Sequence, residues 1–537
     1  MMSLPQPEHG EGTMSISLES RSPGTRTVLS TAAGGKRAGP RAWAGLALLS
    51  LPTIMLGLDL TLLHLALPAL ALDLNPTSVQ ALWIMDAYGF FIAGFLITMG
   101  TLGDRIGRRK MLLIGAVAFA MASVVAAFST SATMLIVARA ALGVAGATLM
   151  PSTLALISNL FADPRQRALG IGIWATMWGV GSALGPVVGG LMLEWFWWGA
   201  AFLLVVPAVF LLVLLGPFVL PEYRSLDAER VDLVSVLLSL AATLPFVYGV
   251  KQIAKEGLVL DASSAIIVGL LFAWLFVRRQ RLLSDPLLDL SLFSNRAFSA
   301  ALAVLLFGLV AVGGTMLLVA QFLQLVVGYS PSDAGLWMGL AALAMIIGGI
   351  GAPLLARVIR PGFVVAGALA LSAVGYLLLA QVTDTSMGVL LAVVSLALAY
   401  LGNGTIAALG TDLAVGTAPA GKAGSASAMT EMVQDLGISF GIALLGSIAG
   451  AIYQRTITPL LAGDLPAGAR DAVADSLWAA SASAVELPAD LVAHAQAAFV
   501  AGLQGAALFS AASVGVLAVI SAIALRHVRS NGVDTGH

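Results

Sequence analysis

Four acidic residues lie inside apolar stretches of the chain, where a charged side chain is costly. Asp59 and Asp86 lie in the first two stretches, and Glu431 and Asp435 lie four residues apart in the thirteenth. That spacing places Glu431 and Asp435 on one face of a helix, where two carboxylates repel each other. A carboxylate within a membrane usually has a function, and it needs a proton or a cation to neutralise it. These residues therefore indicate proton or cation binding inside a membrane.

The elements that must position these acids are membrane-spanning helices. Hydrophobic residues make up 59% of the 537 residues and charged residues only 10%, whereas a water-soluble domain carries about 25% charged residues. The chain contains fourteen apolar stretches, each about 20 residues long, the length that crosses a hydrocarbon core as a helix. We predict spans at 43–70, 80–102, 111–128, 133–158, 168–191, 199–220, 231–250, 262–279, 298–327, 334–356, 361–380, 387–409, 425–452 and 497–525.

The distribution of basic residues predicts the orientation of the chain. With fourteen spans, both tails and every second loop share one side of the membrane, and most of the 27 Lys and Arg residues fall there. Only Lys251, Lys255, Arg455 and Arg470 fall on the other side, and Arg139 falls within the fourth span. Because Lys and Arg accumulate in cytoplasmic loops, we expect a multi-pass protein of a bacterial-type plasma membrane with both termini in the cytoplasm.

Several classes of protein do not fit this sequence. The absence of cysteine excludes disulfides and thiol catalysis, and the five histidines are too scattered to form a metal site. Residues 170–175, GIGIWA, lie inside a predicted membrane helix rather than after a strand, which argues against dinucleotide binding. The net charge of −1 argues against a nucleic-acid partner. We therefore expect no cofactor, no metal and no enzymatic activity.

The loop after the second predicted span combines spaced glycines with an aspartate and several arginines. Its sequence at 100–110 is GTLGDRIGRRK, and the residues of interest are Gly103, Asp104, Arg105, Gly107 and Arg108. The glycines permit a tight turn and close helix approach, and the aspartate can pair with a neighbouring arginine. The pattern resembles the signature loop of the major facilitator superfamily. Residues 352–360 (APLLARVIR) hold a weaker copy, which supports duplication of a six-helix half.

The fifth predicted span contains GSALGPVVGG at residues 181–190. Gly181, Gly185 and Gly189 form a flat stripe on one face, against which a neighbouring helix can pack. Pro186 removes a backbone hydrogen bond and can bend the helix. Packing alone would explain the glycines. The segment also resembles the antiporter signature of exporters in this superfamily, which implies that the bend shapes a central cavity.

Arg139 lies in the fourth predicted span together with Gly143 and Gly146. A buried arginine is costly and usually pairs with an acid or serves a transport pathway, although Arg139 could instead extend to the membrane interface. Exporters of the superfamily carry an R-x-x-Q-G pattern at this position, and this chain has Leu142 where the pattern has glutamine.

Three stretches around the acids resemble the fourteen-helix drug:proton antiporters of this superfamily, and in particular their quaternary-ammonium efflux branch. They are LDLTLLHLALP at 58–68, WIMDAY at 83–88 and TEMVQDLG at 430–437, and the resemblance extends over 42–526. It implies that the four acids bear on transport or substrate recognition. Residues 334–352 lack an acid often found in the tenth helix of that branch, which leaves open whether divalent cations are exported.

Five aromatic residues near these acids could stack on organic cations. Each of them singly could equally fill the apolar interior or lie at the membrane interface. They are Trp83, Tyr88, Trp174, Trp178 and Tyr400.

The resemblance implies an all-α integral membrane protein with the major facilitator fold, two six-helix halves plus two inserted helices. We assign a disordered cytoplasmic N-terminal tail (1–41), an N-terminal half (42–222), two inserted helices (223–285), a C-terminal half (286–528) with an extracellular loop (453–495), and a cytoplasmic C-terminal tail (529–537). We expect the inserted helices to be structural. We expect the loop, which has more acids than bases, to be solvated.

Together these patterns predict a proton-coupled multidrug efflux antiporter that exports lipophilic cations such as quaternary ammonium compounds and dyes. Its partners would be those cations, protons and the lipid bilayer, with no nucleic acid. The main alternative is a proton-coupled exporter of one specific metabolite or antibiotic. An uptake carrier is disfavoured by the segment at 181–190, and a receptor needs no acids deep in the membrane.

Overall fold

The computed structural model describes residues 38–161, 163–222, 232–256, 259–283, 286, 288, 290–383, 386–417, 423–461, 467–482 and 488–525. Over these residues the chain is helical and has no strand. Fourteen helical segments are long and apolar enough to cross a membrane. The number of spans and the all-helical membrane fold that the sequence predicts are therefore confirmed.

The bounds of the helices match the predicted spans closely. The long helices are α1 (Pro40–Leu74), α2 (Ser78–Ile106), α3 (Arg108–Ala127), α4 (Ala132–Leu160), α5 (Pro164–Trp195), the pair α6 (Ala200–Leu203) and α7 (Val205–Val219), α8 (Leu233–Glu256), α9 (Leu260–Leu282), α10 (Arg296–Gln321) with the π-helical turn η2 (Phe322–Val326), α11 (Pro331–Leu355), α12 (Pro361–Leu379), α13 (Ser386–Thr417), α14 (Ala423–Ile457) and α17 (Ala489–Ala524). The short elements are η1 (Leu290–Ser294), η4 (Thr458–Leu460), α15 (Ala467–Asp475) and α16 (Leu477–Ala482).

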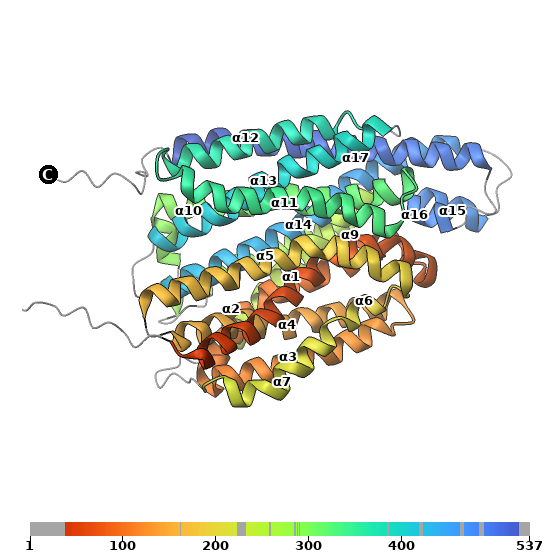
Figure 1. Ribbon diagram of the computed structural model, residues 1–537. Coiled ribbons are helices and arrows are strands. Elements are labelled where there is room, and N and C mark those ends of the chain that lie inside the picture. The colour runs from red at the N-terminus through yellow and green to blue at the C-terminus, as the bar shows by residue number, and fades with distance from the viewer. Residues whose placement is uncertain are drawn as a thin grey trace, which may run out of the picture.

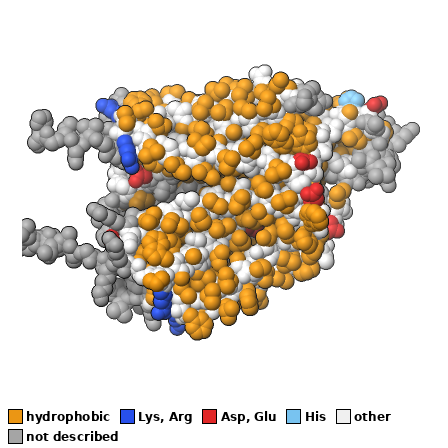
Figure 2. All heavy atoms as spheres, viewed as in Figure 1, with side chains coloured by type: hydrophobic (Ala, Val, Ile, Leu, Met, Phe, Trp, Pro, Cys, Tyr) orange, Lys and Arg blue, Asp and Glu red, His pale blue; other side chains and the backbone are white. Residues whose placement is uncertain are grey.

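The long helices run side by side along one bundle, and its two ends differ in charge. Helix α1 begins and α17 ends at the same end, whereas α15 and α16 lie at the opposite end (Figure 1). On the face shown in Figure 2, Lys and Arg lie at the end where α1 begins, and acidic side chains gather toward the opposite end. We call these the basic end and the acidic end. The predicted loops, which place most Lys and Arg residues on one side of the membrane, require the same difference in charge between the two ends.

The bundle consists of two groups of helices with an additional pair. Helices α1–α7 pack on one another, as do α10–α14 and α17, and the groups meet where α2 contacts α14 and α5 contacts α11. Helices α8 and α9 pack mainly on each other, and α8 contacts α2 and α14. This is the arrangement of two halves with an inserted pair that the sequence predicts, although its domain boundaries remain predictions.

Local sequence sets both ends of α2. At its start, the Thr77 hydroxyl accepts from the Gln80 backbone N–H at 3.2 Å, and the Gln80 side chain accepts from the Thr77 N–H at 3.0 Å. This capping box satisfies donors that a helix start leaves free. At the other end, Gly107 adopts a φ of +112° and joins α2 to α3. Only glycine adopts this backbone without strain, which explains the predicted tight turn.

The glycine stripe of α5 faces α1. A Cβ at Gly189 would lie 2.9 Å from the Leu62 side chain, and a Cβ at Gly185 would lie 3.0 Å from the Leu58 carbonyl. Because the two backbones approach so closely, the Thr61 hydroxyl donates to the Ser182 carbonyl at 3.0 Å. The stripe therefore packs a neighbouring helix directly against backbone, as its spacing predicts.

Replacing Gly185 by leucine is expected to destabilise the α1–α5 contact, because the new side chain would meet α1 backbone that cannot move aside. Overpacking of this kind costs about 1–3 kcal/mol or more. The matched control is Gly172→Leu on the same helix, where nothing lies within 4 Å of the new Cβ. Thermal unfolding of the detergent-purified variants measures the difference, and equal midpoints for the two would contradict the packing.

The inserted helices α8 and α9 are held together at both ends. At the basic end, the Arg279 guanidinium donates to both carboxylate oxygens of Asp232 at 2.8 and 2.9 Å. This pairing lowers the pKa of Asp232 to about 2, so the carboxylate stays charged at neutral pH. At the acidic end, the Tyr248 hydroxyl donates to Asp261 at 2.9 Å. The pair is therefore a self-contained hairpin.

This hairpin packs against the line where the two groups of helices meet. Leu240 of α8 lies 2.7 Å from the place of a Cβ at Gly94 of α2. Val247 of α8 lies in one cluster with Phe90 of α2 and Ala443 of α14. The inserted pair thus covers the seam between α2 and α14, in keeping with the structural role expected from its lack of deep acids.

The prediction of a solvated loop over 453–495 is wrong for the part that the structure describes. Helix α14 continues to Ile457, and α15 and α16 follow it as ordered elements. Val473, Leu477 and Ala480 are buried in the core of the second group of helices. These apolar residues recur at helical spacing, which is typical of helices with one buried face.

Candidate functional site

A buried ion pair joins three helices of the first group. Arg139 on α4 is only 1% exposed, and its guanidinium lies 2.7 Å from the Asp59 carboxylate on α1. Its Nε donates to the Ile84 carbonyl of α2 at 3.1 Å, and its guanidinium lies 4.7 Å from the centre of the Tyr88 ring. The sequence presents Asp59 as an isolated acid, whereas the structure gives it a partner on another helix.

Tyr88 brings this ion pair close to the second group of helices. Its ring contacts the guanidinium of Arg139, which pairs with Asp59. The next residue, Gly89, faces α14, where a Cβ would lie 3.6 Å from the Asp435 carbonyl and would meet the Ser439 side chain. One acid from each group of helices is thus held near the same tyrosine.

The other two predicted acids extend this cluster along α2 and α14. Asp86 is fully buried, at 0% exposure, and lies one helical turn from Gly89 on the side of α2 that faces α14. Glu431 lies one turn from Asp435 toward the basic end, and both side chains are half-buried. The carboxyls of Glu431 and Asp435 act on each other electrostatically.

Glu431 and Asp435 have no basic partner among the residues that the structure describes. Arg139 pairs with Asp59, and the other described ion pairs lie at Arg109–Glu222 and Arg279–Asp232. Removing a bare carboxylate from water is costly. Protons or a bound organic cation would supply the missing charge, so the geometry suits an exchange of one for the other.

The five predicted cavity aromatics do not share one place. Only Tyr88 lies at the ion pair. Trp174 is buried and donates from its indole N–H to the Thr153 hydroxyl of α4 at 3.0 Å. Tyr400 is buried in the core of the second group, and Trp178 is half-buried on α5. A role for these three in binding a cation stays a prediction.

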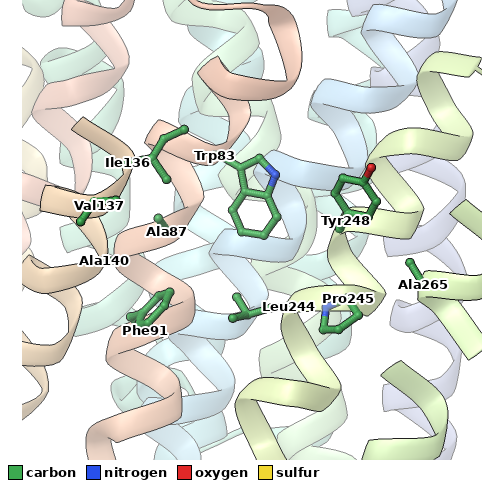
Figure 3. Close-up of a pocket in the computed structure, with 10 residues that line it drawn as sticks. All are labelled: Trp83, Ala87, Phe91, Ile136, Val137, Ala140, Leu244, Pro245, Tyr248 and Ala265. Atoms are coloured by element: carbon green, nitrogen blue, oxygen red, sulfur yellow. The ribbon is translucent and has the colours of Figure 1, made fainter. Parts of the chain in front are cut away.

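Trp83 lies instead at a groove on the side of the bundle. The groove has a volume of about 710 Å³, and α2, α4, α8 and α9 form its walls. Figure 3 shows the Trp83 ring on α2 facing Tyr248 on α8 across this space, with Phe91 below. All three residues are aromatic, and the lining of the groove does not include the ion pair.

The signature loop is anchored by residues that the sequence analysis did not single out. The Arg109 backbone N–H donates to the Glu222 carboxylate at 3.0 Å, and its guanidinium donates to the carbonyls of Pro217 and Leu220 at 3.2 and 2.9 Å. Arg109 of α3 thereby satisfies carbonyls that the C-terminal end of α7 leaves free. The resemblance pointed to the loop but could not reveal its partner, which lies 113 residues away.

The predicted residues within that loop have different surroundings. Gly103 and the buried Arg108 are in contact, since a Cβ at Gly103 would lie 3.3 Å from the Arg108 side chain. Arg105 is exposed. The side chain of Asp104 lies outside the described residues, so its pairing with an arginine stays a prediction.

The second seam between the groups involves the proline of the predicted antiporter segment. Gly335 of α11 packs under the Pro186 carbonyl of α5, and a Cβ at Gly190 would lie 2.8 Å from the Ser332 backbone. At mid-helix, Met345 lies at van der Waals distance, 3.9 Å, from the place of a Cβ at Gly179. This seam therefore includes contacts from mid-helix to the acidic end.

Comparisons with known proteins agree with this architecture. Residues 49–442 match the family described as Major Facilitator Superfamily. The multidrug efflux pump LfrA of Mycolicibacterium smegmatis is 40% identical over 90% of this chain and 97% of its own length. The methyl viologen resistance protein SmvA of Salmonella typhimurium is 34% identical over 80% and 85%, respectively.

A solved structure shares the fold. A bacterial homologue of the human lysosomal transporter Spinster, in an inward-facing and unoccupied conformation, superposes with a TM-score of 0.62 and 18% sequence identity. The superposition covers 91% of this chain and 98% of the other. With fourteen spans, two packed groups of helices and a family match over most of its length, the chain is a transporter of the Major Facilitator Superfamily.

Proposed function

We propose that this protein is a proton-coupled multidrug efflux antiporter of a bacterial plasma membrane, exporting lipophilic cations such as quaternary ammonium compounds and dyes. The observation that carries the proposal is the pairing of Asp59 with Arg139 beside Tyr88, next to Gly89, which packs on the Asp435 turn of the other half. An acid from each half can then be bound or released as the halves move.

The exchange follows from the cost of bare charge in a closed site. Asp435 and Glu431 can be neutralised by protons or by an organic cation, and the two compete for the same carboxyls. Tyr88 offers a ring face that attracts a cation. Proton entry on one side therefore displaces the cation, and cation binding on the other side releases the protons.

The charged ends of the bundle support the orientation. The basic end would lie in the cytoplasm, as Lys and Arg do in bacterial membrane proteins, and both termini would lie there. The halves are in contact at the acidic end. With that end closed, the acids would be reached from the cytoplasm, and rocking of the halves, 42–222 and 286–528, would open the other side.

The names of the relatives fit this substrate class. LfrA is named as a multidrug efflux pump, and SmvA is named for resistance to methyl viologen, which is a flat aromatic cation with quaternary nitrogens. Glu431 and Asp435, which have no basic partner among the described residues, suit such compounds better than neutral ones.

The test is ethidium efflux from inverted membrane vesicles with and without an imposed proton gradient. We expect accumulation of ethidium in the vesicles only when the gradient is present, and inhibition by quaternary ammonium compounds. Each net charge moved down the membrane potential contributes about 2.3 kcal/mol per 100 mV, which sustains roughly a 50-fold substrate gradient. Transport of a single metabolite, or transport indifferent to the gradient, would contradict the proposal.

A further inference from the structure

One contact at the acidic end joins segments 397 residues apart. The Asp475 carboxylate, at the end of α15, accepts from the Ser78 backbone N–H at 2.8 Å and from the Ser78 hydroxyl at 3.0 Å. Ser78 is the first residue of α2, where the helix leaves N–H groups free and carries partial positive charge. The half-buried carboxylate of Asp475 thus binds the start of α2 through two hydrogen bonds, and we call this contact with Ser78 the clasp.

The segment that carries Asp475 belongs to the second half. Helix α15 follows α14 in the chain, and the Tyr453 hydroxyl of α14 donates to the Val473 carbonyl at 2.8 Å in a buried position. Val473 and Leu477 are buried in the core of the second half. The carboxylate therefore moves with the second half, whereas Ser78 moves with the first.

The next residues bring apolar contact across the same gap. Trp478 of α16 packs against the hydrophobic core of the first half, and α16 contacts α1. The clasp at Ser78 thus sits on top of the α2–α14 seam, whose next contact is Leu82 of α2 against Gly446 of α14. Opening the acidic end requires both the clasp and this contact to part.

We propose that Asp475 is a positioning residue of the transport cycle, a latch that holds the acidic end closed by binding the start of α2. The inference rests on the proposed function only in assuming that the halves separate at this end during transport. Because the latch forms in one state and is broken in the other, its strength sets the balance between the states rather than the chemistry of the acid cluster.

The chain contains no cysteine, which allows a direct test. A single cysteine introduced as Leu82→Cys reports on the seam through its rate of labelling by a membrane-impermeant maleimide in intact cells. In that background, Asp475→Asn is expected to raise the labelling rate about tenfold, since weakening two hydrogen bonds to a carboxylate removes on the order of 1.4 kcal/mol. The matched control is Asp471→Asn, which removes an exposed acid from the same helix and should leave the rate unchanged.

A second reporter separates opening from general loosening. Leu72→Cys lies at the end of α1 and is 60% exposed, so its labelling rate should be the same with either acid substitution. Equal rates for Asp475→Asn and Asp471→Asn at Leu82→Cys would overturn the latch. If Asp475→Asn does not accumulate as folded protein, the labelling rate at Leu82→Cys is measured in Ser78→Ala instead. This variant removes the hydroxyl that donates to Asp475 and keeps the backbone N–H. An unchanged rate in Ser78→Ala would then overturn the proposal.

The labelling is done without substrate and in cells whose proton gradient has been collapsed by an uncoupler, so it does not depend on what is exported. A faster rate in Asp475→Asn together with absent proton-driven efflux in the wild type would keep the latch and remove the proposed function. An unchanged labelling rate in Asp475→Asn together with normal proton-driven efflux in the wild type would remove the latch and keep the proposed function.

Discussion

Replacing Arg139 by glutamine is expected to destabilise the protein by about 3–5 kcal/mol and to abolish efflux. The guanidinium is 1% exposed and is the partner of Asp59 at 2.7 Å, so its removal leaves a buried carboxylate without a countercharge. It also frees the Ile84 carbonyl and the Tyr88 ring from their contact with the guanidinium. Thermal unfolding of the purified variant and ethidium efflux from cells measure the two effects.

The double variant Asp59→Asn/Arg139→Gln separates stability from transport. It removes both charges at once, so most of the lost stability should return, because a neutral polar pair is far cheaper to bury than one bare charge. Efflux should stay absent, since the site has lost one of its carboxyls. Arg281→Gln, at an exposed position at the basic end of α9, is the matched control. A single Arg139→Gln variant as stable as Arg281→Gln would show that the ion pair does not hold the helices.

The membrane topology could be predicted from the sequence because it depends on local composition. Each span is long enough to cross the bilayer and predominantly apolar, and a backbone in lipid must form a helix. The close approach of α5 to another helix could also be predicted, since the spacing of Gly181, Gly185 and Gly189 is itself a surface. The sequence did not reveal that α1 is the helix that packs on this glycine surface.

Pairings between distant segments could not be predicted in this way. Asp59 and Arg139 were each singled out for the cost of a charge in the membrane, but their pairing across 80 residues depends on how α1 and α4 cross. The same holds for Arg109 with Glu222 and for Ser78 with Asp475. None of these partners lies at a helical spacing from the other, so no periodicity connects them.

The aromatic residues show a second limit of sequence reasoning. Proximity in sequence to an acid places a ring on the same helix but leaves its direction open. Trp83 is three residues before the buried Asp86, yet its ring lines a groove against the inserted helices. Tyr88, two residues after Asp86, reaches the ion pair. The direction that each side chain takes depends on the neighbours of α2, which the sequence of α2 does not contain.

Replacing Asp435 by asparagine is expected to reduce proton-driven export of monovalent organic cations by roughly 10- to 150-fold. A charged partner in a hydrogen bond contributes about 1.5–3 kcal/mol, and each 1.4 kcal/mol corresponds to tenfold. Asparagine keeps the size and polarity of the side chain, so the Gly89 contact with this turn of α14 should survive. Stability should therefore change little, in contrast to Arg139→Gln.

The matched control is Asp412→Asn, the same substitution at an exposed position of α13 in the second half, which should leave efflux unchanged. The loss in Asp435→Asn should come from coupling as well as binding, because asparagine neither takes up a proton nor neutralises a cation. Downhill exchange of labelled for unlabelled ethidium, without a gradient, measures binding and movement alone. If exchange falls as far as proton-driven export, Asp435 acts only in binding. If exchange falls less, Asp435 also carries the proton, and the competition at this carboxyl is the step that links the two flows.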